Sequence, residues 1–87
     1  MGVYVDDAQI AYRRMKMCHM IADTPAELHS MAAVLGLKRR WFQGKASFPH
    51  YDICLTKRNE ALKYGAVLVD RKTLALKMRE IRKTWTI

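Results

Sequence analysis

Residues 17–36 read MCHMIADTPAELHSMAAVLG and predict a strand followed directly by a helix. Side chains alternate between the two faces of a strand, so a strand over 17–22 places Met17, His19 and Ile21 on one face. Cys18 and its alternate neighbours then lie on the other face. The stretch predicts a sheet packed against a helix.

The helix is expected over about residues 25–35. Thr24 can accept a hydrogen bond from the amide of Glu27, whose side chain can reach back, and Pro25 occupies the first helical position. Gly36 suits the left-handed residue that follows many helices. An apolar stripe recurs at helical spacing, formed by Leu28, Met31, Ala32 and Leu35.

The rest of the chain extends this pattern in both directions. It predicts strands at 2–5 and 38–43, a loop at 44–50, a helix from about 57 to 64 capped by Thr56, a strand at 66–69 and a helix at 72–84. The apolar run at 66–69 is typical of a strand buried on both faces of a parallel sheet. The fold class is therefore a single small α/β domain, residues 1–87, with a short mixed or parallel sheet and three helices in the order ββαβαβα.

The charge of the chain is unevenly distributed. The formal net charge is +8, and residues 1–37 sum to −1 whereas residues 38–87 sum to +9. Such an excess favours a polyanionic partner, nucleic acid or a nucleotide phosphate. No apolar run approaches the ~18 residues of a membrane span, and Asp6 and Asp7 interrupt any secretory signal. We expect a cytoplasmic protein with no membrane partner, and its small size favours a homodimer.

Basic and aromatic side chains alternate in a way that suits phosphate binding and base stacking. The candidate phosphate ligands are lysines and arginines within residues 38–45 and at the start of the second helix. Two aromatic side chains are the candidate stacking groups. The full set of candidates is Arg39, Arg40, Trp41, Lys45, Tyr51, Lys57 and Arg58.

Carboxylates and histidines at the predicted strand ends indicate a second kind of site. Ligands gather at the carboxyl ends of strands in open α/β sheets, and His50 and Asp52 share a side if their segment is extended. A divalent metal ion held by Asp6, Asp23, His50 and Asp52 is one hypothesis. The candidate catalytic residues are His19, Asp23, His50 and Asp52, with His19 or His50 as the alternative general base.

Each of these features also has a purely structural interpretation. Carboxylates at element ends commonly cap backbone amides, and a histidine between Met17 and Ile21 is commonly a half-buried structural residue. Trp41 and its neighbour Phe42 can equally belong to the core, with the surrounding charges solvated. Cys18 and Cys54 lack the spacing of a zinc site and are expected as reduced, buried thiols.

Several stretches together resemble a known family, the small proteins of phages and bacteria classed as domain of unknown function 4031. The stretches, in order, are Val3-Tyr4-Val5-Asp6, residues 18–24, Glu27-Leu28-His29, Trp41-Phe42-Gln43, His50-Tyr51-Asp52, Lys57-Arg58 and Gly65-Ala66-Val67. The resemblance runs from Val3 to about Asp70. It implies a phage or prophage setting and an intracellular protein, and it implies no particular reaction.

Three functions are therefore open at this point. The first is a small basic protein that binds nucleic acid or a nucleotide phosphate and needs no cofactor. The second is a metal-dependent phosphodiesterase or nuclease, with a divalent ion as cofactor. The third is a phage protein that binds and blocks a host protein.

Overall fold

The computed structural model describes residues 2–44, 48–83 and 85. Its strands are β1 (Val3–Asp6), β2 (Ile10–Tyr12), β3 (Met15–Ala22), β4 (Tyr51–Cys54) and β5 (Val67–Val69). Its helices are α1 (Pro25–Val34), the 3-10 helix η1 (Arg39–Trp41), α2 (Leu55–Lys63) and α3 (Arg71–Arg82). The predicted α/β fold class is thereby confirmed.

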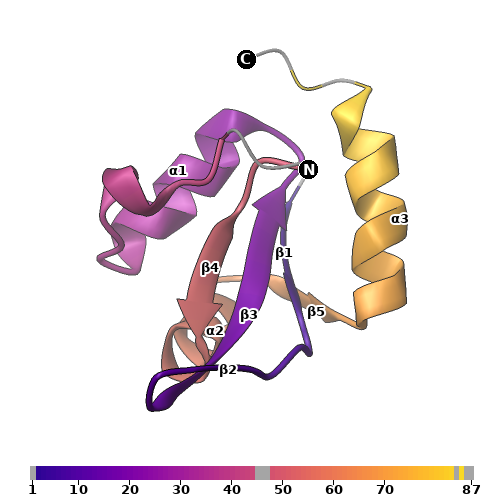
Figure 1. Cartoon of the computed structure of the whole chain (residues 1–87). Coiled ribbons are helices and arrows are strands. Elements are labelled where there is room, and N and C mark those ends of the chain that lie inside the picture. Colours follow the sequence, from indigo (N-terminus) through magenta and orange to yellow (C-terminus); the bar gives the residue numbers. More distant parts are fainter. Residues whose placement is uncertain (1, 45–47, 84, 86–87) are drawn as a thin grey trace.

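The longest strand, β3, organises the sheet. It pairs antiparallel with β1 through residues 20–22, with β2 through 15–17 and with β4 through 17–20. β5 lies on the other side of β1 and pairs parallel with it. Figure 1 shows β4, β3, β1 and β5 side by side, with β2 running across one end. The sheet is mixed, and β2, β4 and β5 each pair with a single strand in the described part of the chain.

Helices pack on both faces of this sheet and make three layers (Figure 1). α1 and α2 cover the face that carries Met20, Tyr51 and Ile53, all fully buried. α3 covers the opposite face and packs on Ile21. Because α3 lies over β1 and β5, the same face stays open at β2 and the start of β3, where several large apolar side chains are exposed: Ile10, Tyr12 and Met15.

The ends of α1 follow the sequence signals closely. Thr24 Oγ1 accepts from the Glu27 amide at 3.2 Å, and the Thr24 hydroxyl donates to the Glu27 carboxylate at 2.9 Å. The reciprocal bond therefore runs between the side chains rather than to the Thr24 amide. Gly36 has φ +76°, and the amide of Leu37 donates to the carbonyl of Ala32. These bonds satisfy the last carbonyls of the helix and fix the direction in which the chain leaves it.

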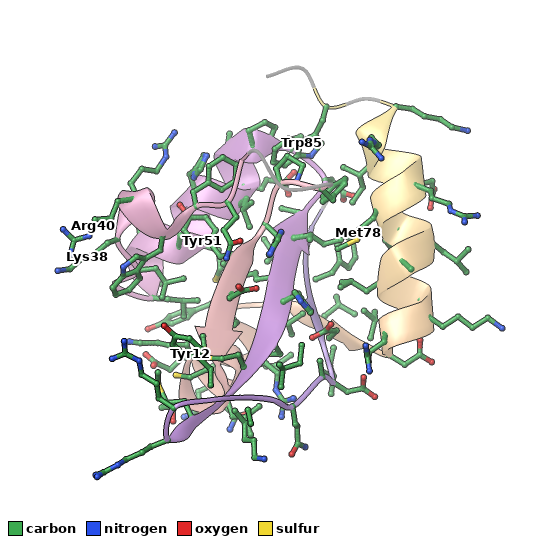
Figure 2. The ribbon with its side chains drawn as sticks, viewed as in Figure 1. Tyr12, Lys38, Arg40, Tyr51, Met78 and Trp85 are labelled. Carbon is green, nitrogen blue, oxygen red and sulfur yellow. The ribbon has the colours of Figure 1, made fainter. Side chains whose placement is uncertain are left out.

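α3 also forms as its pattern predicts. Asp70 caps the helix by accepting from the amide of Thr73, and the stripe of Leu74, Met78 and Ile81 packs toward the sheet. Figure 2 shows Met78 between α3 and the strands. No helix in the described residues is long and apolar enough to cross a membrane.

The predicted strand over 38–43 is wrong. Arg39–Trp41 is a 3-10 helix, in which the amides of Trp41 and Phe42 donate to the carbonyls of Lys38 and Arg39. Strand pairing in this segment is reduced to a single bridge between Gln43 and His50. Local turns satisfy the backbone of this segment instead, and Phe42 packs against the core. The strand that pairs with β3 is β4, after the expected loop.

Three further details differ from expectation. β2 lacked a sequence signal because it is short and fully exposed. Thr56 lies inside α2, whose cap residue Cys54 makes no side-chain bond. β5 runs parallel to β1 as predicted, but Val67 and Leu68 are about half exposed because β5 is an edge strand that the helices only partly cover.

Candidate functional site

Asp6 and His19 form the innermost pair of the site. Asp6 ends β1, is 1% exposed, and accepts from the backbone amides of His19 at 2.9 Å and Ala8 at 3.4 Å. Its second oxygen lies 2.7 Å from His19 Nδ1. The antiparallel pairing of β1 with β3 places the two side chains on one face of the sheet. Asp6 thereby fixes the orientation of the imidazole.

The two groups shift each other's pKa. Burial alone would raise the pKa of the Asp6 carboxyl, but hydrogen bonds from the His19 ring and amide, the charge of His19 and the amide of Ala8 outweigh burial and lower it. The hydrogen bond to Asp6 raises the pKa of His19 above its ordinary value of 6.5, against the opposing effect of burial. The pair is therefore an ionised carboxylate beside an imidazole that readily takes a proton.

His50 is held in the same way by a different acceptor. Its Nδ1 lies 2.7 Å from the carbonyl oxygen of Phe48, whose side chain is buried in the cluster under α3. The ring of His50 meets the ring of His19 edge to face, with centroids 5.5 Å apart. Residues 48–50 thus place a second oriented imidazole against the ring of His19.

Asp52 completes the group from β4, directly opposite His19 in the strand register. Its Oδ1 lies 3.2 Å from His50 Nε2 and 3.9 Å from His19 Nε2. Its Oδ2 accepts from the Gln43 side-chain amide at 2.6 Å. Both Nε2 atoms near Asp52 Oδ1 therefore belong to rings whose Nδ1 is held by a neighbour.

Both histidines present the same nitrogen to Asp52. A carboxylate and a carbonyl only accept hydrogen bonds, so Nδ1 carries the proton in each neutral ring. Each Nε2 then keeps its lone pair. An imidazole whose Nδ1–H donates to a carboxylate or a carbonyl is the usual arrangement of a metal-binding histidine.

The spacing of the three ligand atoms suits one metal ion. One atom each from His19, His50 and Asp52 lies within 4.8 Å of the other two. Ligands bound at about 2.0–2.1 Å around a tetrahedral zinc ion are about 3.3 Å apart. The His50–Asp52 distance of 3.2 Å already matches this separation. The His19–Asp52 distance of 3.9 Å is longer, so these two groups would have to move closer together around one ion.

Asp23 does not join this group. Its amide donates to the carbonyl of Gly2 and its carboxylate accepts from the Tyr4 hydroxyl at 3.0 Å. Because β3 runs antiparallel to β1, the carboxyl end of β3 lies beside the amino end of β1, away from Asp6. The structure therefore does not bring Asp23 together with His19, His50 and Asp52, the other candidate residues. Asp6 is likewise a partner of His19 rather than a direct ligand in the three-residue group.

A largely apolar groove of about 800 Å³ leads to His19 and Asp52. It is lined by Ile10, Tyr12 and Met15 from the β2–β3 hairpin, and by Arg40 and Trp41 from η1. Figure 2 shows Tyr12 and Arg40 on the same side of the molecule. The groove has the size of a small-molecule or nucleotide site.

Only some of the candidate phosphate-binding residues line this groove. Arg40, Trp41 and Lys57 line it. Arg39 lies near the His29–Tyr51 pair, and Arg58 has a buried Nε without a partner in the described residues. Lys45 lies outside the described residues.

Tyr51 cannot stack on a ligand. Its side chain is fully buried, and its hydroxyl lies 2.9 Å from His29 Nδ1. Cys18 is also buried and inert, because burial raises the pKa of its thiol to about 12. Both residues belong to the core beneath β4, on the face of the sheet opposite His19 and Asp52.

Three participants were missed by sequence reasoning. The Phe48 carbonyl and the Gln43 amide orient His50 and Asp52, and such bonds leave no trace in residue spacing. The third is Arg71, whose charge is close enough to lower the pKa of His19. Arg71 begins α3 beside the carboxyl ends of β1 and β5. Its position just after a predicted strand could have identified it as a candidate site residue.

The metal-free protein is expected to lose stability as the pH rises above 6.5. The pKa of His19 is raised on folding, so its contribution is full below the ordinary value of 6.5 and is lost as the pH rises through the raised value. The pKa of Asp6 is lowered on folding, so its contribution is full above the ordinary value of 3.8 and is lost only as the pH falls through the lowered value. Urea unfolding in a chelator at several pH values tests this. The His19→Gln profile should lack the alkaline decline, and parallel profiles would contradict the assignment.

Comparison with known proteins yields one match. Residues 3–81 match the family described as Protein of unknown function (DUF4031). Neither the curated proteins nor the solved structures provide a significant match to the chain. The matched range includes both strands and the connecting residues that bring His19, His50 and Asp52 together. The chain belongs to the DUF4031 family.

Proposed function

We propose that the protein is a divalent-metal-dependent phosphoesterase that acts on a nucleotide or on nucleic acid. The observation that carries the proposal is the orientation of the two histidines. Asp6 and the Phe48 carbonyl hold the Nδ1 atoms, and both Nε2 atoms face Asp52 Oδ1. In the neutral rings both Nε2 lone pairs point toward one carboxylate, and a cation shared by the three groups would satisfy all of them.

The ligand set favours particular metals. Two imidazole nitrogens and one carboxylate oxygen suit Zn²⁺, Mn²⁺ or Fe²⁺, whereas Mg²⁺ and Ca²⁺ prefer oxygen ligands. Three protein ligands leave a coordination position for water, as in catalytic zinc sites. Asp52 is the most exposed of the three, at 39%, and it lines the groove.

The basic side chains near the ligand group support a phosphate substrate. Lys57 and Arg40 line the groove that ends at Asp52, and Arg71 stands on the other side of His19. A divalent ion held by His19, His50 and Asp52 would supply an activated water and polarise a phosphoryl oxygen. Hydrolysis of the ester would transfer the phosphoryl group to water, and a proton of that water would end on the leaving alkoxide. The cations stabilise the negative charge that develops on the phosphoryl oxygens.

Calorimetry on chelator-treated protein tests the proposal directly. Zn²⁺ or Mn²⁺ should bind at one site per chain and raise the melting temperature, and bis(4-nitrophenyl) phosphate and single-stranded DNA should be cleaved only with metal. His50→Ala should remove binding and cleavage, whereas Lys77→Ala, on α3 outside the ligand group, should keep both. The absence of heat and of a thermal shift with all three of Zn²⁺, Mn²⁺ and Mg²⁺ would refute the metal centre.

Of the three functions that the sequence left open, this proposal unites the first two. Nucleic acid or nucleotide phosphate supplies the substrate, and the phosphodiesterase supplies the reaction. Binding to a host protein, a phage origin and homodimer formation stay predictions of the sequence, on which no contact among the described residues bears.

A further inference from the structure

We infer that the groove binds the base of a single-stranded nucleotide unit, with the base against Trp41 and the adjoining phosphate at the His19–Asp52 end. The inference deepens the proposed function, and the position of the phosphate rests on it. Three features of the groove indicate this substrate class: its aromatic surface, its charge and the connection between its two ends.

The first feature is exposed aromatic surface. Trp41 and Tyr12 are 47% and 53% exposed, although both line the groove. Large aromatic rings left half in water are the usual stacking platforms of proteins that bind single-stranded nucleic acid. Met15 and Ile10 continue the apolar surface between the hairpin and the ligand group. A sugar or an inorganic phosphate would leave this surface unused.

The second feature is charge. Arg40 and Lys57 are the cations of the groove lining, and Asp52, the proposed metal ligand, is its one carboxylate. Lys57 also lies 3.4 Å from Glu60, but this pair is partly exposed and such pairs contribute little, so Lys57 is free to turn to a stronger anion. A ligand that combines a flat apolar ring with a phosphate matches this lining, and a neutral apolar ligand does not.

The third feature is the connection between the ends of the groove. The Gln43 side chain donates to Asp52, and Trp41 precedes Gln43 by two positions with extended backbone at Phe42. Two extended residues span about 7 Å. The backbone that carries the indole is therefore linked to Asp52 through a short segment and the Gln43 side chain, an arrangement that suits a base and a phosphate joined through one sugar.

Comparing adenosine 5′-monophosphate with ribose 5-phosphate tests the inference, because only the first carries a base. Binding is measured by calorimetry and by tryptophan fluorescence, with and without Zn²⁺. Adenosine monophosphate should bind about tenfold or more tightly than ribose 5-phosphate, as expected for one stacked base. Trp41→Ala should remove this preference and leave ribose 5-phosphate binding unchanged, and Trp41→Phe should restore part of it.

Tyr64→Ala is the matched control, because Tyr64 is 60% exposed but lies outside the groove. Its preference for adenosine monophosphate should equal that of the unaltered protein. Equal binding of the two phosphates, or an unchanged preference in Trp41→Ala, would overturn the inference even if Zn²⁺ binds. A preference that persists without Zn²⁺ binding would support the base site and refute only the metal centre.

Discussion

Asp52→Asn should weaken Zn²⁺ binding by about two orders of magnitude or more. The substitution keeps the size of the side chain but removes the negative charge that faces both Nε2 atoms. Since Asp52 is partly exposed, the free energy of unfolding of the metal-free protein should change by less than about 0.5 kcal/mol. Calorimetry and urea unfolding on the same samples separate the two effects.

Asp7→Asn is the control for Asp52→Asn. It makes the same change of charge close to the site, at an exposed residue next to Asp6. Its Zn²⁺ affinity should match that of the unaltered protein within about twofold, since Asp7 is outside the ligand group and salt screens the effect of an exposed charge. Equal losses in both variants would mean that general electrostatics, and not ligation by Asp52, governs metal binding.

Asp6→Ala should destabilise the metal-free protein by about 3 kcal/mol. The substitution leaves the buried amides of His19 and Ala8 without their acceptor and the His19 ring without its partner. For a domain of this size the melting temperature should fall by roughly 15 °C. Differential scanning calorimetry and urea unfolding measure the loss.

Asp6→Asn isolates the role of the same residue in orienting His19. The amide oxygen can still accept from the backbone, so the fold should be largely retained, but the ionic partner of His19 Nδ1 is gone. Zn²⁺ affinity should fall about 10–100-fold, as expected for a group that positions a ligand. A stable Asp6→Asn protein with unchanged affinity would show that Asp6 serves the fold alone.

Short sequence signals predict the helices whose ends or packing faces they form. The Thr24 cap, the glycine at position 36 and the stripe of α3 are short-range features, and the structure confirms all three. The strand at 38–43 failed because β-propensity says nothing about whether a partner edge is available. β3 offers that edge to Tyr51–Cys54 instead. Pairing partners far apart in the chain lie beyond what spacing can predict.

The same limit explains the candidate site. His50 and Asp52 are two positions apart, so an extended backbone was enough to predict their meeting. The place of Asp23 depended on the direction of β3, which the sequence does not specify. The His19–Asp52 pairing depends on the register of β3 with β4. Sequence reasoning therefore named the three members of the group together with Asp23, which the structure places beside Tyr4.

The assembly of the ligand group from separate segments has a thermodynamic consequence. His19 lies in β3 and His50 follows α1 and η1, so an ion that binds both would cross-link a loop of about thirty residues and hold β4 against β3. In a chain of this length, with a small core, such a cross-link matters more than in a large protein. Free ion at a hundredfold excess over its dissociation constant would stabilise the native state by about 2.7 kcal/mol. The availability of metal in its surroundings would then set the lifetime of the folded protein as well as its activity.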